Sequence, residues 1–202
     1  MILAFSRMLG LCLLILCHFS VLSQRINPIS LVESIDIDSA KNMLSWTDRQ
    51  GYHIVMMETF DERSGEEPDT QSSWVYITHE LQTESRRNQT WTYQSGEYDC
   101  PVDVYAGLRA APTFSDLNED GVYEIWFIIE KSCKGDISPS QLEILMVDEN
   151  GKQYLAQGET LLHFPDGNID GGAYDVGDFD RLPQIYRDFA ENYFLQNSQN
   201  YF

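Results

Sequence analysis

The chain has 202 residues, which is enough for one ordinary domain with a buried core and too few for two large ones. Its 32 Asp and Glu residues outnumber its 13 Lys and Arg residues, so the net charge at pH 7 is −19 and the isoelectric point is near 4.3. This imbalance argues against a nucleic-acid-binding protein and against docking on an anionic membrane, and the 43% hydrophobic content excludes a disordered acidic protein.

Residues 1–23 have the pattern of a secretory signal peptide. Arg7 precedes an apolar run over residues 8–16, and Val-Leu-Ser at 21–23 fits the small-residue rule for cleavage before Gln24. Cleavage would remove one basic and no acidic residue, which leaves a mature chain with a net charge of −20. We therefore expect an exported protein, located in the periplasm, at the cell surface or in the medium.

Two other interpretations of this segment remain open. A transmembrane anchor needs about 20 apolar residues, but His18, Ser20 and Ser23 interrupt the run, so we expect no transmembrane segment after signal removal. A lipoprotein would carry its lipid on Cys17, although the small residue that normally precedes such a cysteine is missing.

Signal cleavage also changes the cysteine count. Cys12 and Cys17 belong to the signal, so Cys100 and Cys133 are the only pair left in an oxidising compartment, and we expect a disulfide between them. Two separate buried thiols are the alternative. Because His and Cys residues do not cluster in the sequence, a zinc site is not expected.

After a short polar leader over residues 24–31, the mature chain is typical of β-structure. Its apolar, aromatic and β-branched segments are 32–37, 53–60, 74–81, 91–93, 102–108, 122–129, 142–147 and 153–156. The acidic stretch 61–72 contains Gly and Pro and predicts an exposed loop, and Asn150-Gly151 between two apolar runs predicts a hairpin.

Residues 116–124, with the sequence DLNEDGVYE, form the pattern of a calcium-binding loop. Side-chain oxygens at alternate positions, from Asp116, Asn118 and Asp120, point to one side of a tight turn that a following glycine permits. The backbone carbonyl of Val122 and the carboxylate of Glu124 complete an oxygen ligand set that suits Ca²⁺.

An EF-hand is not the expected context of this loop. Its twelfth position, which would need a bidentate glutamate, is Phe127, and the loop leads into β-rich sequence rather than a helix. A solvated acidic turn is the alternative to a metal site, because Asp, Asn and Gly are ordinary turn residues.

A second stretch repeats the spacing less completely. Asp166, Asn168 and Asp170 occupy positions 1, 3 and 5, but the next carboxylate, Asp175, lies one place later than the pattern requires. These four residues are a possible second metal site, with a plain glycine-rich loop as the alternative.

The C-terminal region predicts the one helix. Pro183 suits the first turn of a helix, and Ile185, Tyr186, Phe189 and Tyr193 recur at three- and four-residue steps up to about residue 196. We therefore expect residues 32–202 to form a mainly β (α+β) domain, an antiparallel meander or sandwich with an amphipathic helix over 183–196 packed on the sheet.

The 116–124 segment is similar to the calcium loops of FG-GAP and VCBS-type β repeats. From Asp99-Cys100 to the C-terminus, the chain also resembles a family of small secreted bacterial proteins loosely labelled as surface polysaccharide biosynthesis proteins, with no assigned reaction. The shared marks are Asp99-Cys100, the loop, Cys133, the hairpin at 142–156 and Leu182-Pro183.

The other candidate residues favour structural roles. His53 and His79 lie in predicted strands, outside any metalloprotease motif, and are expected to be packed or half-exposed, and the chain has no G-x-S-x-G motif. Aromatic residues in strands usually fill cores, although they can also stack on a glycan. The tryptophans concerned are Trp46, Trp74, Trp91 and Trp126.

Two functional classes follow. The first is an exported, non-catalytic, calcium-stabilised β domain that binds or supports a polysaccharide or protein of the bacterial cell envelope. The alternative is a hydrolase that acts on a surface glycan through carboxylates. A cleft lined by a carboxylate pair, with the pKa of one member raised, would favour the hydrolase.

Overall fold

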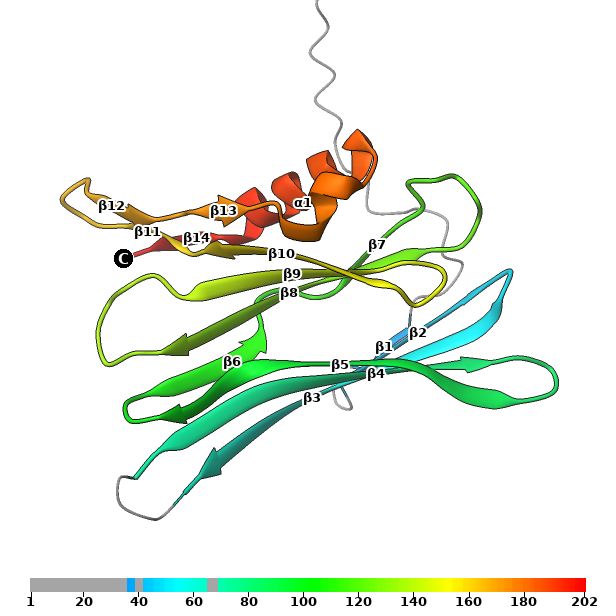
Figure 1. Cartoon of the computed structure of the whole chain (residues 1–202), viewed down its shortest axis with the longest axis horizontal. Coiled ribbons are helices and arrows are strands. Elements are labelled where there is room, and N and C mark those ends of the chain that lie inside the picture. The colour runs from blue at the N-terminus through cyan, green and yellow to red at the C-terminus, as the bar shows by residue number, and fades with distance from the viewer. Residues whose placement is uncertain (1–35, 39–41, 65–68) are drawn as a thin grey trace, which may run out of the picture.

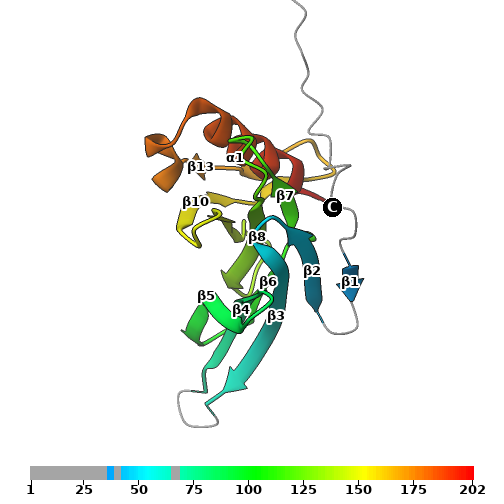
Figure 2. The same ribbon diagram turned by 90° about the vertical axis from the view of Figure 1, so that its right-hand side faces the viewer.

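Two β-sheets lie face to face in the computed structural model, and helix α1 (Gln184–Asn197) covers the outer face of the second sheet (Figure 1). The structure describes residues 36–38, 42–64 and 69–202, so the predicted signal peptide (1–23) and leader (24–31) lie outside the described residues. Figure 2 shows α1 and the first sheet on opposite sides of the second sheet. The described part of the chain is therefore mainly β with a C-terminal helix, as the sequence predicts.

The first sheet is an antiparallel meander of β1 (Asp36–Asp38), β2 (Met43–Asp48), β3 (Gly51–Arg63), β4 (Gln71–Gln82) and β5 (Arg87–Cys100). In β4, every second residue from Ser73 to His79 is buried, so one face of the strand points into the core. The predicted loop over 61–72 is shorter than expected, because β3 and β4 stay paired as far as Arg63 and Gln71. Backbone ladders do not depend on apolar side chains, so exposed polar residues continue the hairpin here.

The second sheet has the spatial order β13-β10-β9-β8-β6, with β7 beside β8. Its strands are β6 (Val104–Leu108), β7 (Thr113–Ser115), β8 (Glu124–Cys133), β9 (Gln141–Val147), β10 (Gln153–Glu159) and β13 (Tyr174–Asp175). Strands β9 and β10 form the hairpin that Asn150-Gly151 predicts, and Gly151 has the positive φ of 77° that such turns require.

Two cores share this second sheet. The first lies between the sheets, where Trp46, Val55 and Ile77 of the first sheet meet Phe127 and Leu145 of the second. The second core lies under the helix; its largest fully buried members include Trp126, Ile128, Ile144, Phe179 and Phe194. Strands β8 and β9 are thus buried on both faces, which explains why their sequences are continuous apolar runs.

The helix begins one residue later than predicted. Pro183 is its N-cap, with φ −52°, and α1 runs from Gln184 to Asn197 after a 3-10 helix, η1 (Gly177–Arg181). The side chains that α1 buries against the sheet are Phe189, Ala190, Tyr193 and Phe194. Among the described residues, no helix is long and apolar enough to cross a membrane.

A third, small sheet was not expected from the sequence. It has the order β12 (Ile169–Gly171), β11 (Leu161–His163) and β14 (Gln199–Tyr201), and β11 and β14 are parallel. A parallel pair needs a crossover connection, which η1 and α1 supply. Arg109 holds the returning strand by donating to the carbonyl oxygens of Asn197, at 3.0 Å, and Gln199, at 2.8 Å.

The structure pairs Cys100 with Cys133 as a disulfide, with the Cα atoms 5.7 Å apart. Cys100 ends β5 of the first sheet, and Cys133 ends β8 of the second sheet. The disulfide therefore ties the two layers of the sandwich together at one end.

Candidate metal loop and buried histidine pair

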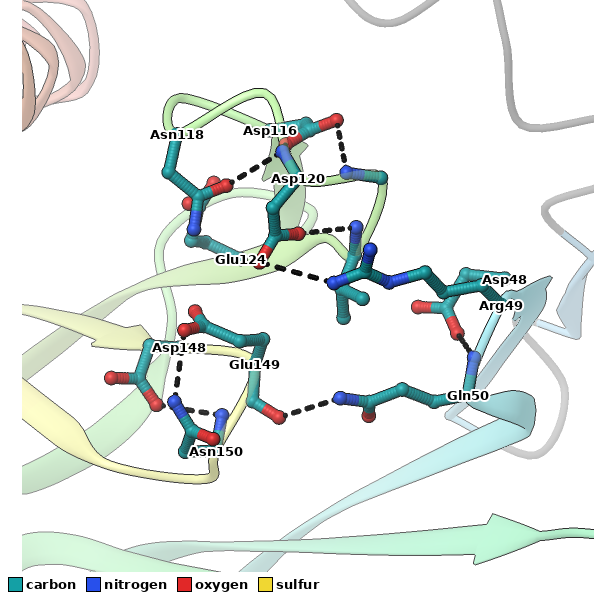
Figure 3. A network of polar contacts seen from close by, with 12 residues as sticks. Asp48, Arg49, Gln50, Asp116, Asn118, Asp120, Glu124, Asp148, Glu149 and Asn150 are labelled. Carbon is teal, nitrogen blue, oxygen red and sulfur yellow. Dashed lines mark hydrogen bonds and ion pairs between the residues drawn. The ribbon is translucent and has the colours of Figure 1, made fainter.

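Three connections meet at the other end of the sandwich: the β2–β3 turn, the β7–β8 loop and the β9–β10 turn (Figures 1 and 3). Figure 3 shows Arg49 and Gln50 of the first sheet reaching across to the second. The guanidinium of Arg49 lies 3.4 Å from Oδ2 of Asp120, and the amide of Gln50 donates to the carbonyl oxygen of Glu149 at 3.0 Å. The β2–β3 turn of the first sheet thus contacts the acidic β7–β8 and β9–β10 connections of the second sheet.

The predicted calcium loop folds around its own side chains. The carboxylate of Asp116 accepts hydrogen bonds from the backbone N–H groups of Asp120, at 2.9 Å, and Gly121, at 3.0 Å. Asn118 Oδ1 accepts from the same Asp120 N–H at 3.1 Å, and Asp120 Oδ1 accepts from Val122 N–H at 2.7 Å. Through these bonds, the side-chain oxygens of Asp116, Asn118 and Asp120 all contact the backbone of residues 120–122.

Glycine is needed in this loop for conformation rather than for space. Gly121 has φ 80°, and a Cβ built on it would meet nothing within 4 Å. Glu119 also has a positive φ, 56°. The chain therefore makes the sharp turn that the spacing of the ligands predicts.

Glu124, the predicted ligand at position 9, is fully buried at the start of β8. One carboxylate oxygen accepts from Ser115 Oγ at 2.6 Å and from Leu117 N–H at 3.1 Å, and the other accepts from the Tyr186 hydroxyl at 2.9 Å. Burial raises the pKa of Glu124, while these hydrogen bonds act in the opposite direction. Glu124 thus fastens the base of the loop to β7 and to helix α1.

The oxygen atoms of this loop could supply only part of the coordination shell of Ca²⁺, and water would supply the rest. In the described part of the chain, no three His, Cys, Asp or Glu side chains converge as a metal site. The loop instead offers the carboxylates of Asp116 and Asp120, the amide oxygen of Asn118 and backbone carbonyls such as that of Val122. These are hard oxygen donors of the kind that Ca²⁺ accepts, with water completing six to eight ligands.

The second motif is divided between two sheets. Asp166 and Asn168 lie in the β11–β12 turn, Asp170 lies in β12, and Asp175 lies in β13. Asp166 accepts from Asn168 N–H at 3.0 Å, and Asp170 and Asp175 each accept from a nearby glycine N–H, of Gly171 and Gly177, at 2.9 and 3.0 Å. The four residues thus come from one turn and from strands of two different sheets, rather than from one continuous loop.

A hydrogen-bonded chain of side chains, buried except at its last member Thr90, was not predicted from the sequence. Asp48 Oδ1 lies 2.8 Å from His53 Nε2, and His53 Nδ1 lies 3.0 Å from His79 Nε2. His79 Nδ1 is hydrogen-bonded in turn to the hydroxyl of Thr90. His53 and His79 are 4% and 5% exposed, so their predicted packing in strands is confirmed, but their pairing depends on strand register, which no local pattern shows.

Two tryptophans enclose this histidine pair. The ring of Trp46 stacks on His53 with centroids 4.6 Å apart, and Trp91 stacks on His79 at 5.1 Å. Trp46, Trp91 and Trp126 are all buried, which confirms the core interpretation for these three residues. Trp74 instead lies half-buried on the outer face of the first sheet.

A cavity of about 130 Å³ lies between the sheets beside the histidine pair. Gln50 and residues 148–151 of the β9–β10 turn line its outer part. Its aromatic and polar wall includes Trp46, His53, His79, Thr90, Trp91 and Tyr123. The cavity thus adjoins both the histidine chain and, through Tyr123, the predicted calcium loop.

Comparisons with protein-family models, with curated proteins and with solved structures find no match to this chain.

Proposed function

We propose that the chain is an exported, calcium-stabilised β-sandwich domain that serves as a binding or accessory component of the bacterial cell envelope. The arrangement of the 116–122 loop carries the proposal. Asp116, Asn118 and Asp120 accept hydrogen bonds from the N–H groups of residues 120–122, so the three side chains are ordered around one tight turn. The resemblance of this segment to the calcium loops of β repeats supports the same assignment.

In this proposal, Ca²⁺ is held by the side chains of Asp116, Asn118 and Asp120 and by the carbonyl of Val122. Glu124 keeps the loop in place through Leu117 N–H. The ion would supply rigidity rather than chemistry, because it joins groups within one loop. Calcium would also compete with Arg49 for the carboxylate of Asp120, since both are cations at the same group.

Charge and surface chemistry support a binding role. A chain with a net charge near −20 repels an acidic glycan but not a neutral one, so a neutral glycan is the better partner unless divalent ions bridge the two. On the outer face of the first sheet, Trp74 lies between Phe60 and Tyr98, which are 39% and 51% exposed. Exposed aromatic clusters of this kind are typical of interaction surfaces.

The carboxylate-based hydrolase remains the alternative, and its acid pair would lie in the cleft of about 320 Å³ lined by Glu143, Glu159 and Asp175. In that cleft, Glu143 lies 3.2 Å from the ammonium of Lys131 and accepts a hydrogen bond from the hydroxyl of Tyr93. A carboxylate committed to these partners is not free to protonate a leaving group. The cleft therefore favours a structural role for Glu143.

Thermal melting with calcium and with a chelator tests the proposal. Binding to the native state alone adds about 2.7 kcal/mol at a hundredfold excess over Kd, which corresponds to roughly 5–10 °C for a chain of this size. Asp120→Asn is expected to abolish this difference. Asp170→Asn, the matched change at position 5 of the second motif, is expected to leave it intact. Equal melting temperatures in calcium and in chelator would contradict the proposal.

A further inference from the structure

The chain of Asp48, His53, His79 and Thr90 has a fixed direction. A carboxylate can only accept hydrogen bonds, so His53 must donate its Nε2 proton to Asp48. With neutral rings, His79 then donates its Nε2 proton to His53 Nδ1, and Thr90 donates its hydroxyl proton to His79 Nδ1. His79 therefore presents an unprotonated ring nitrogen to the hydroxyl of Thr90.

The environment keeps Asp48 ionised and His79 neutral at pH 7. Burial acts to raise the pKa of Asp48, but the hydrogen bonds from His53 and from Gln50 N–H outweigh it and lower the pKa below its ordinary value. Burial, together with the neighbouring His53, lowers the pKa of His79 to about 4. Asp48 is thus ionised and His79 is neutral at pH 7, so Nδ1 of His79 can accept the hydrogen bond of the Thr90 hydroxyl.

A β-bulge places Thr90 in this chain. In the β4–β5 pairing, His79 is opposite Trp91 and Glu80 is opposite Gln89, which leaves Thr90 without a partner in the register. In a regular strand, the side chains of Thr90 and Trp91 would point to opposite faces. At this irregularity both residues contact His79, one by a hydrogen bond and the other by ring stacking.

Thr90 is also the accessible end of the chain. Asp48 and His53 have side chains that are 1% and 4% exposed, whereas Thr90 is exposed and lines the 130 Å³ cavity together with His79. A small molecule in the cavity would therefore meet the hydroxyl of Thr90 first. Protons released there could pass inward along the buried chain without entering bulk water.

We propose that Thr90 is a nucleophile for acyl transfer from small, uncharged carboxylic esters, with His79 as its general base and with His53 and Asp48 as positioning residues. This proposal goes beyond the calcium-stabilised domain proposed above, which assigns no reaction. The size of the cavity limits the acyl group to a few carbon atoms, and the carboxylates of Asp148 and Glu149 at its rim disfavour anionic esters.

In the first step, Thr90 Oγ1 bonds to the ester carbonyl carbon, the π electrons of the C=O bond move to the carbonyl oxygen, and the hydroxyl proton of Thr90 passes to Nδ1 of His79. His79 passes its Nε2 proton to Nδ1 of His53, and the imidazolium that results is stabilised by the carboxylate of Asp48. The C=O double bond then re-forms as the bond from the carbonyl carbon to the alcohol oxygen breaks. His53 returns the Nε2 proton to His79, and Nδ1 of His79 gives its proton to the leaving alcohol. Water repeats the sequence on the acyl-threonine, which releases the carboxylic acid and restores the hydroxyl.

The test uses the purified chain, p-nitrophenyl acetate as the ester and an uncharged fluorophosphonate as the covalent probe. Release of p-nitrophenol is expected, and peptide mapping should place the phosphonyl group on Thr90. Thr90→Val should lower the rate by about 100-fold, the usual contribution of an activated group, whereas Thr90→Ser should retain it. His79→Gln should lower the rate similarly, with its fold checked by circular dichroism.

Thr92→Val, two residues along β5, is the matched control and is expected to behave as the wild type. The proposal is overturned if Thr90→Val hydrolyses the ester as fast as the wild type, or if the probe labels no residue or labels a residue other than Thr90. Because Thr90 is exposed, its substitution tests the chemistry without removing a core side chain.

Discussion

Replacing Cys100 and Cys133 together with alanine is expected to lower the free energy of unfolding by about 3–4 kcal/mol, as estimated from the loop that their disulfide closes. The two cysteines are 33 residues apart in the sequence, and the cross-link restricts the unfolded chain between them. It also joins β5 of the first sheet to β8 of the second, so its loss should loosen the contact between the layers.

Urea denaturation with and without a reducing agent measures this effect. Reduction should destabilise the wild type and leave the double alanine variant unchanged. Intact-mass analysis of the purified, oxidised protein should find two hydrogens missing and no Cys100 or Cys133 thiol that can be alkylated before reduction. Equal urea midpoints for the oxidised and reduced wild type would show that the pairing contributes nothing to stability.

Acidification from about pH 6.5 to about pH 4 is expected to cost about 3 kcal/mol of stability through His79 alone. Burial and the neighbouring His53 lower the pKa of His79 in the folded protein to about 4, from an ordinary value of 6.5. Between these values the unfolded chain binds a proton that the folded chain does not. Stability therefore falls as the pH falls through this window.

Two other buried acids, Asp48 and Glu124, change the dependence of stability on pH in opposite directions. The pKa of Asp48 is lowered, so its contribution is lost only at still lower pH, as the pH falls through its folded pKa. The pKa of Glu124 is raised, chiefly by burial, so its protonation adds relative stability as the pH falls below its folded pKa.

Urea midpoints measured across this pH range separate the contributions. His79→Gln should flatten the profile between about pH 6.5 and about pH 5. A wild-type profile that is already flat above about pH 5 would show that His79 is not held neutral by its surroundings.

The parts of the fold that local patterns determine could be predicted from the sequence. Strands β8 and β9 are continuous apolar runs because they are buried on both faces, and the β9–β10 hairpin follows from Asn150-Gly151. The 3.6-residue period of the helix gave its bounds to within one residue. The parallel β11–β14 pair was not predicted, because it joins segments on either side of the helix.

The candidate sites also contain parts that local sequence patterns could predict and parts that depend on distant segments of the chain. The hydrogen bonds of Asp116, Asn118 and Asp120 run within seven residues, 116–122, so their spacing alone could predict a folded loop. The role of Glu124 could not be predicted, because its partner Tyr186 lies 62 residues away on the helix. The Asp48–Thr90 chain depends on the register of four strands, joined by three pairings, and on a bulge, and neither is encoded in a short motif.

Isothermal titration of the purified, chelator-treated chain with Ca²⁺ tests the central claim most directly. We predict binding of one calcium ion per chain to the wild type and to Asp170→Asn. No binding is expected for the double variant Asp116→Asn and Asp120→Asn, in which two charged ligands of the 116–122 loop are replaced by amides of similar shape. Absence of binding to the folded wild type, or equal binding by the double variant, would contradict the assignment of this loop as a calcium site.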